Sequence, residues 1–456
     1  MPHTAPCERL NSRPRNRTEG AAVPAMLRRA IGLHMVAAML ASANPAVAAD
    51  PLSGKALYDD VLRYDGFGPH RYGSAGAAQA FDWIAGELAR AGLAVSSQSF
   101  TMDRQYDFEA GSLSVDGQTV AVMPHWWIPE PLASFSLSAP IAAAGDASGR
   151  FVGVSLPFDR AAYLTQAHRA ALDEAFARRP AAVLLTIDHP SGEIYTYNVD
   201  QEGKSWPVPV ILVAARDKAL LDGAQQAGRP VAVDIKGRYR REVAGRNVIG
   251  RLDRGLNRSA GGRSIAVSTP VTSWFTSTCE RAPGIAGFLA MARLANTLAD
   301  ADLVFVATAG HEIGHGGMAQ FIRSQAPPPA STLAWAHFGA SLACHEWRRD
   351  GERWVAGSAV DARLRVIARS QSMDDLVRRH FRGIVGASLV GDKAAVGELR
   401  DVHAAGYPNF FGMAGLHGLF HTPADSAAGT NPESLEPIAR AFAGALGEAA
   451  ALTSAR

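Results

Sequence analysis

The stretch ADLVFVATAGHEIGHGG, residues 301–317, predicts the fold of the carboxyl half of this chain. It passes from an apolar segment, Ala301–Thr308, into a turn rich in glycine, histidine and glutamate. A short apolar run that ends in a turn is typical of a strand buried on both faces. Helical spacing of apolar residues resumes over His315–Arg323. The stretch therefore predicts a buried strand, a loop that carries titratable side chains, and a helix.

The same alternation continues on both sides of this stretch. Further apolar runs predict strands, and the segment GIAGFLAMARLANTL predicts a long helix. Alternating strands and helices indicate an α/β fold, in which a mixed, mostly parallel sheet is flanked by helices. Functional side chains in such folds lie just beyond the carboxyl ends of the strands. The predicted strands are Val248–Leu252, Ser264–Ser268 and Leu333–Phe338, and the helix is Gly284–Leu298.

The pattern of predicted helices and strands changes along the amino-terminal half. A helix over Ala75–Ala91 precedes a strand over Leu93–Met102, and a polar, hairpin-like stretch follows as far as Val122. Short strands between Gly/Pro turns then surround one long helix, Ala161–Arg178, which predicts an inserted mixed α/β domain. The predicted parts are a leader (1–49), the first part of a catalytic-type domain (50–128), the inserted domain (129–238) and a catalytic-type core (239–456).

Composition limits the classes of function. The chain has 456 residues, of which 47% are hydrophobic and 19% charged, and this excludes wholesale disorder, collagen-like repeats and a coiled coil. With 45 basic and 43 acidic residues, nothing in the net charge of +2 favours binding to nucleic acid. Three cysteines cannot make a disulfide scaffold or a four-cysteine zinc site. A globular, multi-domain enzyme or a large binding module remains.

The first residues indicate export. Met26-Leu-Arg-Arg opens an apolar run from Ala30 to about Ala43, and a small-x-small site ends near Asp50. This order is typical of a secretory signal peptide, whereas the run is too short to span a bilayer stably. We therefore expect a secreted or periplasmic protein that starts at Met26; an internal apolar helix is the alternative. The mature chain keeps Cys279 and Cys344, which could pair or stay reduced.

His311-Glu312-Ile313-Gly314-His315 matches H-E-x-x-H, the pattern of single-zinc proteases. That pattern needs both histidines inside one helix, so that their imidazoles lie on one face. Here a strand ends at Thr308, and glycines crowd the segment. The context therefore disfavours this interpretation.

Four motifs together resemble the co-catalytic zinc aminopeptidases of peptidase clan MH. The turn after the predicted strand is similar to their G-E-E-x-G, with His311 in place of the first Glu. The other motifs are NVIG at 247–250, CERAPGIA at 279–286, which resembles D-N-A-S-G-V-A, and FHTPAD at 420–425, which resembles Y-H-T-x-x-D. AGYP at 405–408 also matches, and the inserted block resembles a protease-associated domain. The resemblance covers nearly all of the mature chain.

The resemblance implies one zinc ion. Its ligands would be Glu280, Glu312 and His421, with an open fourth position of the kind that catalytic zinc sites keep. His311 would act as the base. A second zinc is not excluded. However, Thr269-Pro270-Val271 stands where the family carries the H-x-D motif that supplies ligands for this ion. Near the position of the ion's other expected ligand, an Asp in the family, the sequence offers only His337. Glu398, which stands where an Asp often occurs, would orient the reacting groups.

Further residues follow from the same alignment. We expect His315, His417, Asp425 and Trp274 around the ligands or the substrate. The implied activity is zinc-dependent hydrolysis of a peptide or small amide. The alternatives are a cyclase of the glutaminyl type and a catalytically degenerate member that only binds a ligand. Glu280 with Arg281 could also be an ordinary ion pair at a helix start, and His337 a structural core histidine.

Overall fold

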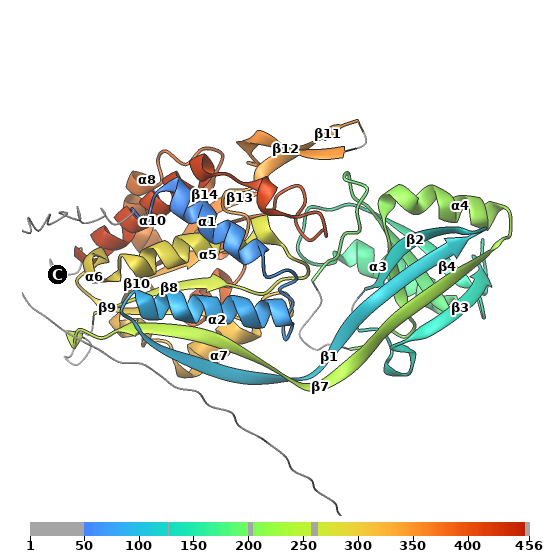
Figure 1. The fold of residues 1–456 in the computed structure, drawn as a ribbon, viewed down its shortest axis with the longest axis horizontal. Helices are drawn as coiled ribbons and strands as arrows, with labels where there is room; N and C mark the ends of the chain where they lie inside the picture. Colours follow the sequence, from blue (N-terminus) through green and yellow to red (C-terminus); the bar gives the residue numbers. More distant parts are fainter. Residues whose placement is uncertain (1–49, 126, 199–203, 257–262, 352, 452–456) are drawn as a thin grey trace, which may run out of the picture. The chain divides into compact units, whose positions relative to one another are not determined.

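A computed structural model describes residues 50–125, 127–198, 204–256, 263–351 and 353–451 (Figure 1). The predicted leader and signal peptide, residues 1–49, lie outside the described residues. From residue 50 onward the described chain forms a single unit.

A 13-stranded sheet organises this unit. In spatial order its strands are β14 (Ser388–Val390), β13 (Arg365–Arg369), β15 (Phe410–Gly415), β10 (Thr332–Phe338), β8 (Ser264–Pro270), β9 (Asp302–Thr308), β7 (Pro230–Leu252), β1 (Ala94–Val115), β2 (Gln118–Pro124), β6 (Val210–Val213), β5 (Ala182–Asp188) and β4 (Phe151–Pro157). Strand β3 (Phe135–Pro140) pairs with β7, and β11 (His345–Asp350) forms a separate hairpin with β12 (Arg353–Val360).

The strands β15, β10, β8 and β9 are parallel to one another, which confirms the predicted mixed, mostly parallel sheet. His337 on β10 pairs with Ser268 on β8 and with Gly412 on β15, and Pro270 pairs with Thr308 at the end of β9. The carboxyl ends of these strands therefore meet at one edge of the sheet. Side chains that follow them are brought close together, as in other α/β folds.

Helices cover both faces of this part of the sheet (Figure 1). Along β9, Leu303 and Phe305 face the larger core, whereas Val304 and Val306 face the smaller one, as the two-residue period of a strand requires. The larger core contains α1 (Gly54–Asp65), α2 (Ala75–Arg90), α5 (Thr278–Arg293), α6 (Ala295–Leu298), α8 (Asp374–His380) and α10 (Pro432–Ala451). The smaller core contains α7 (Gly316–Ser324) and α9 (Leu399–Ala404).

Strands β1 and β7 are much longer than the predicted segments Leu93–Met102 and Val248–Leu252. They pair antiparallel from Ala94 opposite Arg251 to Ser114 opposite Ala232, with a shift of register between Phe108 and Ala110. They run on into a second group of strands, β2 to β6, with α3 (Gln166–Ala177) and α4 (Lys218–Gln226) (Figure 1). The boundaries of the predicted inserted domain, 129–238, stay a prediction.

Helix α5 begins earlier than predicted, at Thr278 instead of Gly284. The carboxylate of Asp425 accepts hydrogen bonds from the backbone amides of Cys279 (2.9 Å) and Glu280 (3.0 Å). These amides are among those that a helix start leaves without partners, so a distant side chain caps the helix. Helix α3 begins later than predicted, after the capping residue Thr165.

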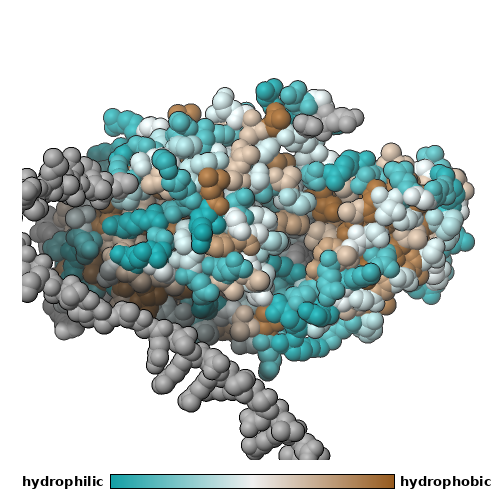
Figure 2. Space-filling view, in the orientation of Figure 1, coloured by the Kyte–Doolittle hydropathy of each residue, from teal (hydrophilic) through white to brown (hydrophobic). Residues whose placement is uncertain are grey.

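Hydrophilic side chains predominate on the outer faces of α1 and α2 (Figure 2). This agrees with helices that bury one side against the larger core. Among the helices of the described residues, none has the length and apolar character needed to cross a membrane.

Candidate functional site

The turn after β9 is held in place by Asn247, the first residue of the NVIG motif. The Asn247 side chain accepts a hydrogen bond from Ala309 N (3.1 Å) and donates one to Gly317 O (2.8 Å). A Cβ added at Gly317 would lie 2.3 Å from Ala309 O, so only glycine fits there. Residues 311–314 form turns, α7 begins at Gly316, and His315 has a φ of 62°. The histidines therefore do not share a helix, which excludes the single-zinc protease arrangement.

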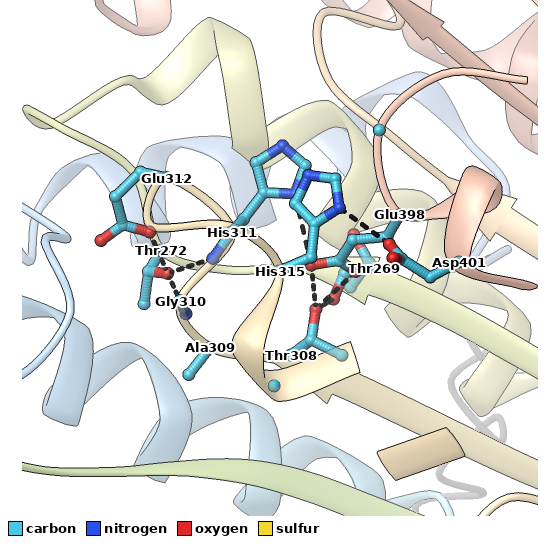
Figure 3. A network of polar contacts seen from close by, with 12 residues as sticks. Thr269, Thr272, Thr308, Ala309, Gly310, His311, Glu312, His315, Glu398 and Asp401 are labelled. Carbon is cyan, nitrogen blue, oxygen red and sulfur yellow. Dashed lines mark hydrogen bonds and ion pairs between the residues drawn. The ribbon is translucent and has the colours of Figure 1, made fainter. Parts of the chain in front are cut away.

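Thr272 connects this turn to the loop that follows β8. Its hydroxyl donates to Glu312 Oε2 (2.6 Å) and accepts from the backbone amides of Gly310 (2.7 Å) and His311 (3.3 Å). The other oxygen of Glu312 accepts from Tyr72 N (2.7 Å). Burial raises the pKa of Glu312, and these hydrogen bonds oppose the increase. Glu312 therefore points to one side of Thr272, and His311 and His315 lie on the other (Figure 3).

His311 and Glu398 form a hydrogen-bonded pair, with 3.2 Å between His311 Nδ1 and Glu398 Oε1. The Thr308 hydroxyl lies within hydrogen-bond distance of both Glu398 oxygens, at 2.9 and 2.7 Å. Burial raises the pKa of Glu398 to about 7. Burial, with a contribution from the charge of Arg281, lowers the pKa of His311 well below its usual value. A neutral imidazole is thus held in orientation by a carboxyl group that titrates near neutrality.

His315 forms a second imidazole–carboxylate pair beside the first. Its Nδ1 lies 2.7 Å from Asp401 Oδ2 on α9. The rings of His311 and His315 stack, with 4.6 Å between their centroids (Figure 3). Two imidazoles with fixed orientations therefore lie side by side at the end of β9.

His337 lies on β10 and is fixed through Ser268. The Ser268 hydroxyl accepts a hydrogen bond from Trp335 Nε1 (2.8 Å) and lies 2.9 Å from His337 Nδ1. We assign the serine proton to this second contact, which leaves the imidazole proton on His337 Nε2. That nitrogen has no hydrogen-bond partner among the described residues. Burial lowers the pKa of His337 to about 3, so the ring is neutral and can donate a hydrogen bond.

These three histidines line a cavity of about 320 Å³. Its other polar walls are Tyr163, Asn198 and Arg400, and Trp274 Nε1 holds Asn198 by a hydrogen bond of 2.7 Å to its Oδ1. The remaining walls are small or apolar: Ala162, Gly339, Ala340, Leu364, Val366, Ala395, Val396, Gly397, Ala414, Gly415, Leu416 and Phe420. An apolar cavity with a few convergent polar groups is typical of a small-molecule site.

A second, fully buried group surrounds Glu280. Arg281 Nη2 lies 2.8 Å from Glu280 Oε1, and both side chains have 0% exposure. Ser273 donates to Glu280 Oε2 (2.8 Å), and Arg281 Nε donates to the Thr272 carbonyl (3.0 Å). Burial alone would raise the pKa of Glu280, but Arg281 and then His421 outweigh it and lower that pKa to about 2. This carboxylate is therefore ionised at neutral pH.

His421 and its neighbours close the far side of this group. His421 Nδ1 donates to the Thr196 carbonyl (2.9 Å), and Nε2 lies 3.6 Å from Glu280 Oε1. Behind it, His417 Nε2 lies 3.5 Å from Asp425 Oδ1, and Asp425 caps α5 at Glu280. A disulfide joins Cys279, the residue before Glu280, to Cys344. His421 has a φ of 59°, an unusual conformation of the kind that clusters at functional sites.

The predicted residues therefore form two groups instead of one. His311, Glu398, His315 and His337 lie around the cavity, with Trp274 behind its wall. Glu280 and His421 form the buried group with Asp425 and His417, and Glu312 is anchored separately. Sequence reasoning missed Asp401, Thr272 and the central position of Arg281. One signal was available for Arg281, because it stands where the family's D-N-A-S-G-V-A motif has a neutral Asn.

Zinc, which the resemblance implies, can be tested against these atoms. In its favour, His421 Nδ1–H is fixed by a carbonyl while Nε2 has no hydrogen-bond partner among the described residues, an orientation typical of metal ligands. The oxygens of Glu312 accept hydrogen bonds from Tyr72 and Thr272, as ligating carboxylates also do, so Glu312 does not decide the question. Within the described residues, the group of three possible ligands at metal-binding spacing is Cys279, Cys344 and His417, and its cysteines form the disulfide. With the Arg281 guanidinium on Glu280, the donor set does not fit a catalytic zinc.

Comparison with known proteins identifies the fold. No family model and no curated protein matches the sequence. A zinc aminopeptidase from Bacillus subtilis superposes with a TM-score of 0.68 at 19% identity, over 88% of this chain and 95% of that one. A peptidase M28 precursor from Shewanella amazonensis gives a TM-score of 0.64 at 17% identity, over 86% and 92% of the two chains. An aminopeptidase from an Aneurinibacillus species gives 0.58 at 15% identity, over 87% and 93%. The chain therefore has the zinc-aminopeptidase fold that its motifs predict.

Proposed function

We propose that this chain is a hydrolase of peptide or small amide bonds. The observation that carries the proposal is the His311–Glu398 pair, which faces a cavity at the carboxyl ends of the parallel strands. A base oriented by a carboxylate is the arrangement that activates a nucleophile in many hydrolases. The structurally similar proteins are named as aminopeptidases, which supports a peptide or amide as the substrate.

The proposed base is His311. When Glu398 is ionised, it accepts a hydrogen bond from His311 Nδ1–H, so Nε2 keeps its lone pair and can take a proton from a water molecule in the cavity. The imidazolium that forms is stabilised by the same carboxylate. His311 can then give the proton from Nε2 to the leaving amine.

His337 is the proposed partner of the substrate carbonyl. Its neutral Nε2–H can donate to an oxygen that gains negative charge as the water attacks. A neutral imidazole is suited to this task because it gives a hydrogen bond without losing its own proton. The base stands on the turn after β9 and the donor on strand β10, and these two strands flank β8 in the sheet. No step in this scheme passes through a metal ion.

The cavity favours small, partly apolar substrates. Leu364, Val366, Leu416 and Phe420 provide an apolar wall, and about 320 Å³ is enough for a small ligand. We further propose that the protein is exported, as the sequence pattern before residue 50 suggests. The disulfide between Cys279 and Cys344 supports an oxidising compartment, where such bonds persist.

A panel of aminoacyl anilides and N-terminal glutaminyl peptides tests the activity. We expect the wild-type protein to release amine from at least one anilide, and His311→Asn to lose this release. Asn keeps a hydrogen-bonding group near the position of Nδ1 but lacks Nε2. The variant therefore distinguishes the role of His311 as a base from its role in stabilising the turn. Cyclisation of glutaminyl peptides without anilide hydrolysis would instead favour an acyltransferase.

A ligand-binding member without catalysis is the second candidate. The observation that favours it is the replacement of the expected metal group by the buried Glu280–Arg281 ion pair. This candidate predicts that no substrate of the panel is turned over. It also predicts that a compound which raises the melting temperature of the wild-type protein does so equally in His311→Asn.

A further inference from the structure

Arg281 is a cation buried in the interior of the protein. Its side chain is completely buried in α5, a helix whose residues from Thr278 to Ala292 are all buried. Arginine cannot lose its proton in a protein, so this position always holds a positive charge. Burying such a charge is costly unless it is paired, and Glu280 pairs with it at 2.8 Å.

The side chain of Arg281 contacts two parts of the site. Its Nη2 lies 2.8 Å from Glu280 Oε1, and its Nε donates to the carbonyl of Thr272, whose hydroxyl donates to Glu312 and accepts from the backbone amide of His311. The guanidinium therefore lies directly against one carboxylate that the resemblance assigned to a metal, and beside the loop that holds the other. Its Nε is fixed by the Thr272 carbonyl, whereas the contact of Nη2 with Glu280 Oε1 is a close ion pair that lacks hydrogen-bond geometry.

We infer that the Arg281 guanidinium takes the place of the zinc ion as the fixed positive charge of this site and excludes a divalent cation from it. Glu280 Oε1, the ligand atom nearest to His421 Nε2, is ion-paired with Arg281. A zinc ion on these two atoms would lie beside a guanidinium that cannot be discharged, and like charges at such separations repel strongly in a protein interior. This exclusion concerns only the occupant of the metal position and does not depend on catalysis.

Zinc titration of matched variants tests the inference without an activity assay. The probe is Zn²⁺ alone, measured by isothermal titration calorimetry in non-reducing buffer, with Co²⁺ absorption as a spectroscopic signature of His and carboxylate ligation. Arg281→Asn installs the neutral residue found in the family motif. We expect this variant to bind one zinc ion about 100-fold more tightly than the wild type, because the repulsion is removed.

Two controls make the result specific. Arg281→Lys keeps the positive charge and should bind zinc as weakly as the wild type. The double variant Arg281→Asn/His421→Ala should lose the gain, because it lacks the histidine ligand. Equal zinc affinity in the wild type and Arg281→Asn would overturn the inference. If Arg281→Asn does not fold, the wild-type protein is compared with His421→Ala instead. Tight zinc binding by the wild type that is lost in His421→Ala would contradict the inference. A wild-type protein that binds no such zinc would support it.

Discussion

Glu280 and Glu398 are both completely buried carboxyl groups, yet their pKa values move in opposite directions, to about 2 and about 7. Burial acts on each in the same sense, because it penalises the charged form. The contrast comes from the neighbours. Glu280 has the Arg281 guanidinium at 2.8 Å, whereas Glu398 has a threonine hydroxyl and a neutral imidazole. One carboxylate is thus a permanent charge and the other a titrating group.

This difference separates two tasks within one site. Glu280 and Arg281 form a completely buried ion pair and do not line the cavity. The group around Glu398 faces the cavity through His311 and can change its protonation near neutral pH. Chemistry on a substrate is therefore expected at the second group.

Removing the Arg281 guanidinium should have the largest effect on the difference between the two carboxyl groups. Arg281→Met leaves Glu280 as an uncompensated buried charge, which should lower the free energy of unfolding by about 3–5 kcal/mol. Urea denaturation measures the loss. The double variant Glu280→Gln/Arg281→Met removes both charges and should recover much of it. A single variant as stable as the wild type would contradict the role of Arg281 as the balancing charge.

Replacing the base should have a large effect on rate and little on stability. His311→Asn is expected to lower kcat by about 10²–10⁴-fold, the usual contribution of general base catalysis. Steady-state kinetics on the best anilide gives the rate, and urea denaturation shows whether the fold is intact. His315→Asn changes the neighbouring stacked ring and serves as the matched control. An equal loss in both variants would show that His311 is not the base.

The donor on β10 can be tested with two variants of similar size. His337→Gln can present an N–H close to the position of Nε2, whereas His337→Leu cannot. Loss of one donor to a developing oxyanion costs about 10²–10³-fold in kcat, so we expect this loss in the Leu variant and a smaller one in the Gln variant. The same kcat in both variants would remove His337 from the mechanism.

The pH profile should show the titration of Glu398. Below its pKa of about 7, the protonated carboxyl donates to His311 Nδ1 and places the imidazole proton on Nε2, so the base is blocked. Activity should therefore rise with pH through about 7, by about tenfold per pH unit on the acid side. In Glu398→Gln the rise in activity near this pH should disappear. A profile that falls as the pH rises through this range would reverse the assigned roles.

Local patterns in the sequence predicted most of the sheet that carries the site. The run Ala301–Thr308 contains the strand β9, Asp302–Thr308, and the helix predicted at Ala75–Ala91 matches α2, Ala75–Arg90, to within one residue. The motifs also predicted that Glu280 and His421, far apart in sequence, lie close together. These features depend on apolar periodicity or on short motifs, which a sequence displays directly.

Features that depend on distant partners could not be predicted in this way. The start of α5 is set by Asp425, and Glu312 is held by Tyr72 and Thr272. The motifs supplied residue types for a metal site, but the contacts of each side chain decide whether its atoms are available. The sequence offered an ion pair of Glu280 with Arg281 as an alternative to a metal site, but only the packing shows that both side chains are completely buried.

Hydrolysis by metal-depleted protein is the decisive test of a mechanism that needs no zinc. The wild-type protein would be dialysed against a chelator, its zinc content measured, and kcat determined before and after on the same anilide. We expect an unchanged kcat with less than about 0.1 equivalent of zinc, because His311, Glu398 and His337 act without it. A kcat that falls with the zinc content and returns when zinc is added would contradict this mechanism.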